Sequence, residues 1–492
     1  TLGAKVTVTN ATATSDSGAA VYSESGAAVT VQGDATATGA GSIGAHTEGG
    51  TIAVSGDARG AECGAVSYGA GSSVTVGGNA VATGAGGIGA AAGDGGTITI
   101  DGEIQTTAIY IRIYSTDMVI GDVTLPTTKE GYSTYSGGSP ISTVWVKMPT
   151  CEIVGGAQYV SLADALLDAN NGDAVRLLAD IVHNSGISIV SKTITLDLNG
   201  HNLKVTETSG AGLSVTYGGI VLTGSGSFDV TGFEYGVQAN AGGVATVTSA
   251  SATSNSGGFG ISAVGGGRVT VTGDVRSDYA GIIAYGADTV VTVGGNVTVE
   301  ANETWGIQAS SSMTGGAEVD VGGNVEVTGG GGILVQGNGS DIHVGGWVEA
   351  TDGGGAEALS GGVAVVDGSV TASAEGASAL GAGSTVTVYG NLSGKLGVIA
   401  LSGGQVEVHG DVGAVMLGAQ AGYDDSRAYI HGAVIVSDAA GIGAEAYGSA
   451  SGEAVVQIDA DITANIYIRV GGDVKDGSEA SRTIPTLLSG YH

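Results

Sequence analysis

The sequence predicts an all-β protein, a right-handed parallel β-helix (β-solenoid), and three observations support this prediction. A unit of short apolar segments and a glycine-rich gap returns about every 22 residues. Within each unit apolar and polar residues alternate, as in strands that bury one face, and helical periodicity is almost absent. Glycine takes 94 of the 492 positions, which suits closely spaced turns. One such unit cannot bury its own apolar face, so successive coils are expected to stack.

Each repeat has a turn position at which Asn, Asp or a substitute follows Gly or its equivalent. We attribute Gly, Asn and Asp here to left-handed backbone conformations, which these residues adopt with little strain. A row of bound Ca²⁺ is the alternative, but Ser, Trp and Ala replace the acidic residue in some repeats, which favours turns. The positions are Asn10, Asp34, Asp57, Asn79, Glu103, Asp274, Asn296, Asn324, Trp347, Ser369, Asn391, Asp411, Ala433 and Asp461.

An aliphatic residue recurs about nine positions beyond the turn. If the coils lie about 4.8 Å apart, these residues are expected to form one continuous column inside the coil. They are Ile43, Val66, Ile88, Ile282, Ile307, Ile333, Ile399 and Ile442.

The repeat is interrupted once, which divides the chain into two tandem blocks. The motif Ile-Tyr-Ile-Arg at residues 109–112 recurs at 466–469, and Pro126 recurs as Pro485, so the blocks are expected to be copies of one unit. Arg112 and Arg469 then hold equivalent places and suggest capping of the final coil. We expect C-terminal coils of a first β-helix at 1–125, a linker at 126–150, a complete second β-helix at 151–476, and a tail at 477–492.

One short helix is expected at the start of the second block, as a lid over its first open coil. Ser161 is a plausible N-cap, and Asn171 and Gly172 form a stop signal. The apolar residues at helical spacing are Leu162, Ala165, Leu166 and Ala169.

The segments around this helix resemble a known family. They are Val-Gly-Gly-Ala-Gln-Tyr at 154–159, the helix itself, Gly-Asp at 172–173, Leu-Leu-Ala-Asp at 177–180 and Leu-Asp-Leu-Asn-Gly-His at 196–201. Together they are similar to the opening of pectate-lyase-like, right-handed β-helix domains of repetitive bacterial cell-surface proteins. The specific similarity covers about 60 residues. It implies a passenger, stalk or adhesive module, commonly without catalysis.

Charge and composition exclude several classes of protein. The 15 Lys and Arg face 47 Asp and Glu, and the formal net charge of −32 argues against nucleic-acid binding. The sequence contains no run of about 18 apolar residues, so we do not expect this segment to insert into a membrane. High acidity and few cysteines favour an extracellular, cell-surface location. For Cys63 and Cys151, a disulfide and two unpaired thiols both remain open.

We expect no catalytic, cofactor or metal site. The cations are scattered singly, without the carboxylate cluster and nearby base that a pectate-lyase-type reaction needs. Two cysteines cannot form a structural zinc site, and the histidines show no ligand spacing in the sequence. Among these histidines are His183, His201, His343, His409 and His431.

One group of aromatic residues is a candidate ligand or partner surface. Tyr235, Phe259 and Trp305 each precede a Gly-aliphatic step and are expected near one longitudinal row, with Tyr279 and Tyr285 close by. Exposed rings in such a row stack on sugars or on a partner, whereas rings buried at a corner form a packing ladder, which we favour.

These inferences predict a non-catalytic, extracellular structural protein of bacterial type. We expect a rigid acidic rod in a cell-surface stalk or filament, with self-association end to end. An adhesin or glycan-binding module that recognises host or matrix glycans is the alternative, and a polysaccharide lyase is the third.

Overall fold

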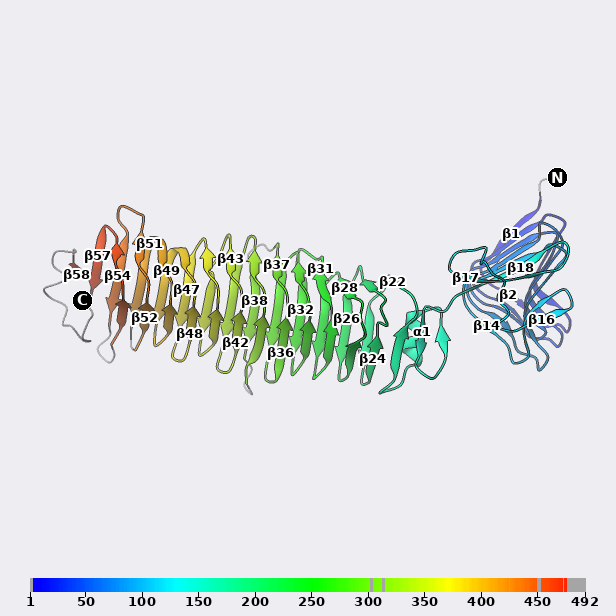
Figure 1. Cartoon of the computed structure of the whole chain (residues 1–492), viewed down its shortest axis with the longest axis horizontal. Coiled ribbons are helices and arrows are strands. Elements are labelled where there is room, and N and C mark those ends of the chain that lie inside the picture. Colours follow the sequence, from blue (N-terminus) through cyan, green and yellow to red (C-terminus); the bar gives the residue numbers. More distant parts are fainter. Residues whose placement is uncertain are drawn as a thin grey trace. The chain divides into compact units, whose positions relative to one another are not determined.

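The computed structural model describes residues 3–300, 304–311, 315–423, 425–448, 453–471 and 473–475. It is a parallel β-solenoid of about 20 turns with about 23 residues per turn, 57% strand and 2% helix (Figure 1). The predicted fold class and repeat length are therefore confirmed. The chain divides into two compact units, Thr1–Ala165 and Leu166–His492.

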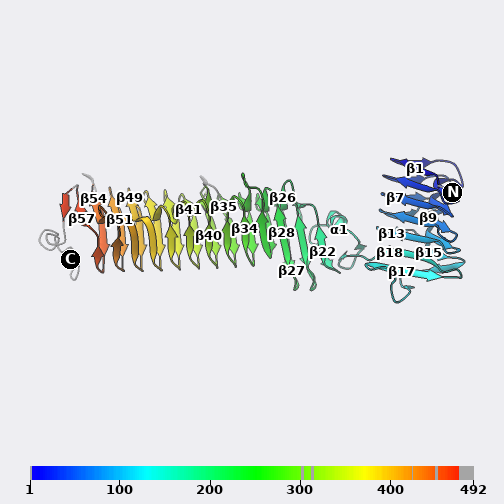
Figure 2. The same ribbon diagram turned by 90° about the horizontal axis from the view of Figure 1, so that it is seen from above.

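The first unit is a stack in which each coil contributes one strand to each of three sheets (Figure 2). The first sheet contains β1 (Lys5–Val8), β4 (Ala28–Val31), β7 (Thr51–Val54), β10 (Ser73–Val76) and β13 (Thr97–Ile100). The second contains β2 (Ala11–Ala13), β5 (Ala35–Ala37), β8 (Ala58–Gly60), β11 (Ala80–Ala82) and β14 (Ile104–Gln105). The third contains β3 (Ala19–Glu24), β6 (Ile43–Glu48), β9 (Cys63–Tyr68), β12 (Ile88–Gly93) and β15 (Ile109–Ile113).

A hairpin lies in the range 126–150, where we expected a linker. Strands β17 (Tyr132–Gly137) and β18 (Ser142–Lys147) pair antiparallel, and β18 continues the first sheet parallel to β13. Tyr135 and Val144 are almost fully buried. The prolines and the Ser, Thr and Gly residues of this segment suggested a turn-rich connection, but its few apolar residues cover the last coil.

Short antiparallel strands follow the last parallel coil in both units. Strand β16 (Thr116–Met118) pairs with β15, and β58 (Asp473–Lys475) pairs with β57 (Ile466–Val470). Arg112 binds Asp117 at 2.6 Å, and Arg469 binds Glu445 at 3.2 Å. The two arginines thus occupy equivalent strands, as the sequence repeat indicated.

The second unit has three faces, of which the second and third belong to one continuous sheet. Its first face contains β21 (Ala174–Leu177), β24 (Thr193–Asp197), β27 (Gly219–Thr223), β30 (Val244–Val247), β33 (Arg268–Val271), β36 (Thr289–Val293), β39 (Ala317–Val321), β42 (Asp341–Val344), β45 (Val363–Val366), β48 (Thr385–Val388), β50 (Gln405–Val408), β52 (Arg427–Ile430) and β55 (Val455–Ile458).

The second face contains β22 (Ile181–His183), β25 (Leu203–Thr206), β28 (Phe228–Gly232), β31 (Ser249–Ala252), β34 (Val275–Ser277), β37 (Val297–Val299), β40 (Val325–Val327), β43 (Val348–Ala350), β46 (Val370–Ala372), β53 (Val434–Val436) and β56 (Ile462–Thr463). The third contains β23 (Ile187–Val190), β26 (Ala211–Thr216), β29 (Tyr235–Asn240), β32 (Phe259–Val264), β35 (Ala280–Tyr285), β38 (Trp305–Ser310), β41 (Gly331–Gln336), β44 (Ala356–Leu359), β47 (Glu375–Leu380), β54 (Ile442–Tyr447) and β57. Strands β49 (Leu392–Leu401) and β51 (Val412–Gly422) run through both faces.

The interior column of aliphatic residues is present, but not every predicted member belongs to it. Ile282, Ile307 and Ile333 are Cα partners in successive coils and are at most 1% exposed. Ile399 instead pairs with Ser378 and lies one residue beyond the buried Val398. Because side chains alternate along a strand, this one-residue difference puts Ile399 on the outer surface.

Four other predicted members also lie outside the main column. Ile442 is the Cα partner of Leu417 and lies two residues before Ala444, which holds the column position in that coil. Val66 and Ile88 belong to a small separate apolar cluster, which the half-buried Ile43 also contacts. A fixed count of nine residues therefore fails where the turn before the strand differs in length.

The Asn and Asp residues at the turn positions form a hydrogen-bonded ladder along each unit. Asn10 Oδ1 accepts from the backbone N–H of Asp34 at 2.9 Å, and Asp34 Oδ1 accepts from that of Asp57 at 2.9 Å. In the second unit Asp274 Oδ1 accepts from Asn296 N–H at 2.8 Å. No predicted turn position has a positive φ, so our left-handed explanation of Asn and Asp is wrong. These residues are acceptors for the next coil.

The ladder also explains why glycine precedes these positions. A Cβ on Gly33 would overlap Asn10 Oδ1, and a Cβ on Gly56 would overlap Asp34 Oδ1. Glycine therefore leaves room for the side chain that arrives from the preceding coil.

The predicted helix is present as α1 (Leu162–Asp168). Ser161 Oγ accepts from the N–H of Asp164 at 3.4 Å, as an N-cap does. At the other end, Lys192 Nζ donates to the carbonyls of Leu166 and Ala169 at 2.7 and 2.8 Å. This lysine supplies two of the bonds that the last turn of a helix lacks.

Candidate functional site

The predicted aromatic row lies on the outer surface of the third face of the second unit. Tyr235 and Phe259 are Cα partners, and their rings stack at 5.9 Å between centroids with planes 10° apart. Tyr279, which precedes β35, meets Phe259 edge to face at 6.2 Å. These three half-buried rings bind each other across successive coils, which is the arrangement of a packing ladder.

Trp305 lies on the same face, but among the described residues it stacks on no other aromatic ring. It is the Cα partner of Gly331, and a Cβ there would lie 2.5 Å from Trp305 Cε3. The tip of the indole also lies over Gly354, one coil further along. A Cβ on Gly354 would lie 3.6 Å from Trp305 Cη2. Trp305 therefore lies flat over two glycines and is half-buried by them.

Tyr285 is separate from the other four rings. It is 46% exposed and lies at the end of β35. It lines an open depression of about 520 Å³ with Ile283, Gln308, Ser310 and Gln336. These residues come from three successive coils, since Tyr285 pairs with Ser310 and Ser310 with Gln336. An exposed ring beside two amide side chains has the composition of a polar ligand subsite.

Histidines and carboxylates meet on the outer surface of the first face. His343 Nδ1 lies 2.9 Å from Asp320 Oδ1, and its Nε2 lies 3.2 Å from Asp367 Oδ2. Partial burial lowers the pKa of His343, but the hydrogen bonds and charges of the two aspartates raise it more, so the net shift is upward.

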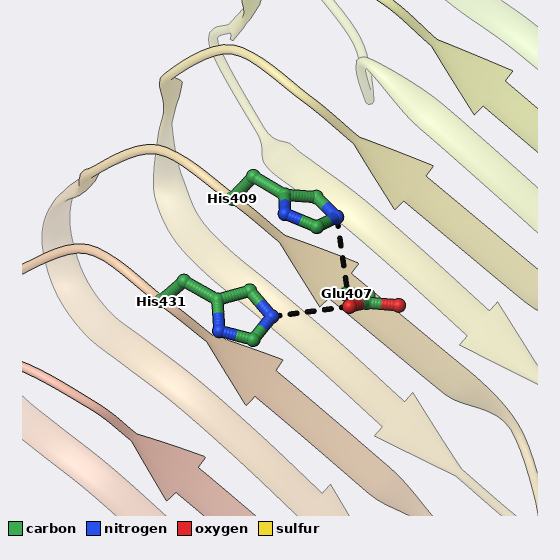
Figure 3. Close-up of side chains that lie close together, drawn as sticks. All are labelled: Glu407, His409 and His431. Atoms are coloured by element: carbon green, nitrogen blue, oxygen red, sulfur yellow. Dashed lines mark hydrogen bonds and ion pairs between the residues drawn. The ribbon is translucent and has the colours of Figure 1, made fainter.

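A second cluster joins Glu407, His409 and His431 on strands β50 and β52 and the residues that follow them (Figure 3). His431 Nε2 lies 3.0 Å from Glu407 Oε1, and His409 Nε2 lies 3.5 Å from the same oxygen. His431 Nδ1 lies 2.7 Å from Asp459 Oδ2. Hydrogen bonds to Glu407 and Asp459 raise the pKa of His431, because they favour the charged imidazolium.

This second cluster was missed in the sequence because its histidines are 22 residues apart. Metal-ligand motifs in a sequence have spacings of a few residues, whereas in a solenoid one full coil separates side chains that touch. The signal available was the shared position of the two histidines, each directly before a Gly at the turn, in His-Gly-Asp and His-Gly-Ala.

Several arginines of the described residues bind a carboxylate in a neighbouring coil, although Arg59 binds Asp57 within its own coil. Arg176 binds Asp197 at 2.8 Å and Arg276 binds Glu300 at 2.6 Å, in each case one coil away. Such pairs tie successive coils.

Both cysteines are free and buried, so of the two alternatives the unpaired thiols are correct. Burial raises the pKa of Cys63 to about 12 and that of Cys151 to about 11. A thiol with so high a pKa is a poor nucleophile near neutral pH.

The comparisons with known proteins give no match to a family model, a curated protein or a solved structure. In the described residues, no helix has the length and apolar character needed to span a membrane. The fold and the surface geometry are therefore the basis for a functional proposal.

Proposed function

We propose that this chain is a non-catalytic, extracellular structural protein, a rigid acidic rod of a bacterial cell-surface stalk or filament. The observation that carries the proposal is the parallel stacking of successive coils, such as the column through Ile282, Ile307 and Ile333. Backbone hydrogen bonds and a continuous apolar interior both resist bending, so each unit acts as a stiff spacer.

Net charge supports the same function. The formal charge of −32 makes the lateral faces of neighbouring rods repel each other and keeps them soluble. The resemblance of residues 154–201 to repetitive bacterial surface proteins supports the cell-surface location. The arginines that tie one coil to the next support a structural rather than catalytic role for these cations.

End-to-end contact is the mode of assembly that we favour. In the described residues, β1, β2 and β3 have a hydrogen-bonded neighbour on one side only. Val6 in β1 is 52% exposed. A strand edge of this kind pairs with a further strand, and end-to-end assembly is the case in which a second chain supplies it.

Electron microscopy of the purified chain over a range of concentrations tests this proposal. Stiff, unbranched rods that lengthen with concentration are expected. Discrete monomers at every concentration would refute end-to-end growth. Release of products from acidic polysaccharides with Ca²⁺ present would refute the non-catalytic assignment.

A glycan-binding module is the second candidate function, and the depression at Tyr285 favours it. Its exposed ring can stack on the apolar face of a sugar, while Gln308 and Gln336 can hydrogen bond to hydroxyl groups. Trp305 is the other ring to test, although it is packed on glycines.

A glycan array with the unaltered chain and with Tyr285→Ala tests this second function. Loss of binding in Tyr285→Ala, with binding retained in Tyr217→Ala, would support it. Tyr217 is a suitable control because it is 69% exposed and does not line the depression. Equal binding by the unaltered chain, Tyr285→Ala and Trp305→Ala would count against it.

A further inference from the structure

We propose that Glu407, His409 and His431 form a binding site for a divalent transition-metal ion of the zinc class on the outer surface of the second unit. The site goes beyond the structural role proposed above. Neither the rod nor the depression at Tyr285 requires it.

The ligand atoms already converge. One carboxylate oxygen, Glu407 Oε1, lies 3.0 Å from His431 Nε2 and 3.5 Å from His409 Nε2 (Figure 3). One ligand atom from each of the three residues lies within 4.8 Å of the others. With bonds of about 2.0 to 2.2 Å, the ligand atoms of one tetrahedral zinc ion are about 3.3 to 3.6 Å apart. Small side-chain rotations therefore bring the three residues to bonding distance.

A second carboxylate orients His431. The Nδ1 atom of His431 lies 2.7 Å from Asp459 Oδ2, and Gln457 donates to the other oxygen of Asp459 at 2.9 Å. A histidine that binds a metal usually donates its other N–H to such a carboxylate, which fixes the ring and makes it a better ligand. Asp459 is therefore a positioning residue, and an ion replaces the proton on His431 Nε2.

Ring stacking holds the two imidazoles face to face. Tyr389 stacks on His409 at 4.7 Å, and His409 stacks on His431 at 4.8 Å. The three rings come from the ends of the successive strands β48, β50 and β52. The side chains of His409 and His431 are 37% and 38% exposed, so an ion from solution reaches them and keeps a coordination position open to water.

The other histidine-carboxylate cluster provides a matched control. His343 has an exposed side chain on the same face, but its two ring nitrogens face Asp320 and Asp367 on opposite sides. No second histidine of the described residues joins them. A single imidazole between two separated carboxylates does not present three converging ligand atoms.

Calorimetric titration of the full, untagged chain with Zn²⁺ tests the proposal. We expect one ion per chain at this site and at least a tenfold loss of affinity in His409→Ala and in His431→Ala. Asp459→Asn should weaken binding about 10- to 100-fold, as loss of an orienting partner usually does. His343→Ala should bind as the unaltered chain does, and circular dichroism should show that every variant is folded.

Co²⁺ provides an independent readout, since its visible absorption reports nitrogen ligands in a tetrahedral site. The band should form with the unaltered chain and with His343→Ala, and should be lost in His431→Ala. The proposal is overturned if His409→Ala and His431→Ala bind Zn²⁺ like the unaltered chain. It is also overturned if His343→Ala weakens binding equally, or if Ca²⁺ at the same concentration displaces the ion, since Ca²⁺ prefers sites made of oxygen atoms.

Discussion

The ladder of turn residues predicts that Asp34 and Gly56 are energetically coupled. Asp34 Oδ1 occupies the space that a Cβ on Gly56 would need, while it accepts the N–H of Asp57 at 2.9 Å. Gly56→Ala must therefore displace the Asp34 side chain and break that bond. Gly56 has no positive φ, so the alanine itself imposes no backbone strain.

The structure sets the expected magnitudes. Loss of one hydrogen bond in Asp34→Ala should lower the local stability by only about 1 kcal/mol, because the bond is exposed and water can replace it. Gly56→Ala should lose this bond and add crowding against Gly33, whose carbonyl group would lie 3.0 Å from the new Cβ. Crowding of this kind costs about 1 to 3 kcal/mol, so the total is about 2 to 4 kcal/mol. Asp34→Ala already removes this hydrogen bond. In that background, Gly56→Ala should therefore lower the free energy of unfolding by about 1 kcal/mol less than it does in the unaltered chain.

Hydrogen-deuterium exchange of the full chain measures this coupling. The peptide that contains Asp57 should exchange about fivefold faster in Asp34→Ala, and Thr30→Ala, an outward substitution on β4, should change it little. Strictly additive effects of Asp34→Ala and Gly56→Ala would refute the steric argument. Unchanged exchange in Asp34→Ala would refute the hydrogen-bonded ladder.

Three further predictions concern the interior, the helix and the surface. Ile307→Ala should lower the free energy of unfolding by about 2 to 5 kcal/mol, because the side chain is fully buried. Gln308→Ala, on the outer surface, should lower it by less than about 0.5 kcal/mol. Thermal unfolding measures both variants, and equal losses would contradict the orientation of the strand. Lys192→Met should speed amide exchange in α1, because two carbonyls lose their donor, and unchanged exchange would contradict this cap. The raised pKa of His343 predicts stabilisation that is full below the ordinary value of about 6.5 and is lost as pH rises through the folded-state value. The gain is less than about 1 kcal/mol for so exposed a group, and His343→Gln should remove this part of the pH dependence of melting.

Much of the fold follows from local pattern, because each coil repeats the same physical problem. Alternation identified the strands, and Ser161 together with Gly172 marked the limits of the helix region. The pattern did not explain the turn residues correctly. Asn10 and Asp34 accept hydrogen bonds from residues one coil away, which no conformational preference of Asn or Asp reveals.

The candidate aromatic site was predicted only in part. The order of Tyr235 and Phe259 along the sequence was enough to place them in one row, since both begin equivalent strands. The different environments of Trp305 and Tyr285 were not predictable, because they depend on what the neighbouring coils offer. Gly331 gives Trp305 a flat surface, and Gln308 and Gln336 surround an open space beside Tyr285.

The sequence by itself determined that the chain winds into stacked coils, since one short repeat cannot bury its own apolar face and a fixed period lets neighbouring repeats cover it. Only the tertiary structure decided the register between coils, which depends on the length of each turn. That register places Ile399 on the outside, and it brings His409 and His431, 22 residues apart, onto one carboxylate oxygen of Glu407. In a solenoid the nearest neighbour of a side chain is one coil away, so its chemistry is set by stacking rather than by adjacent residues.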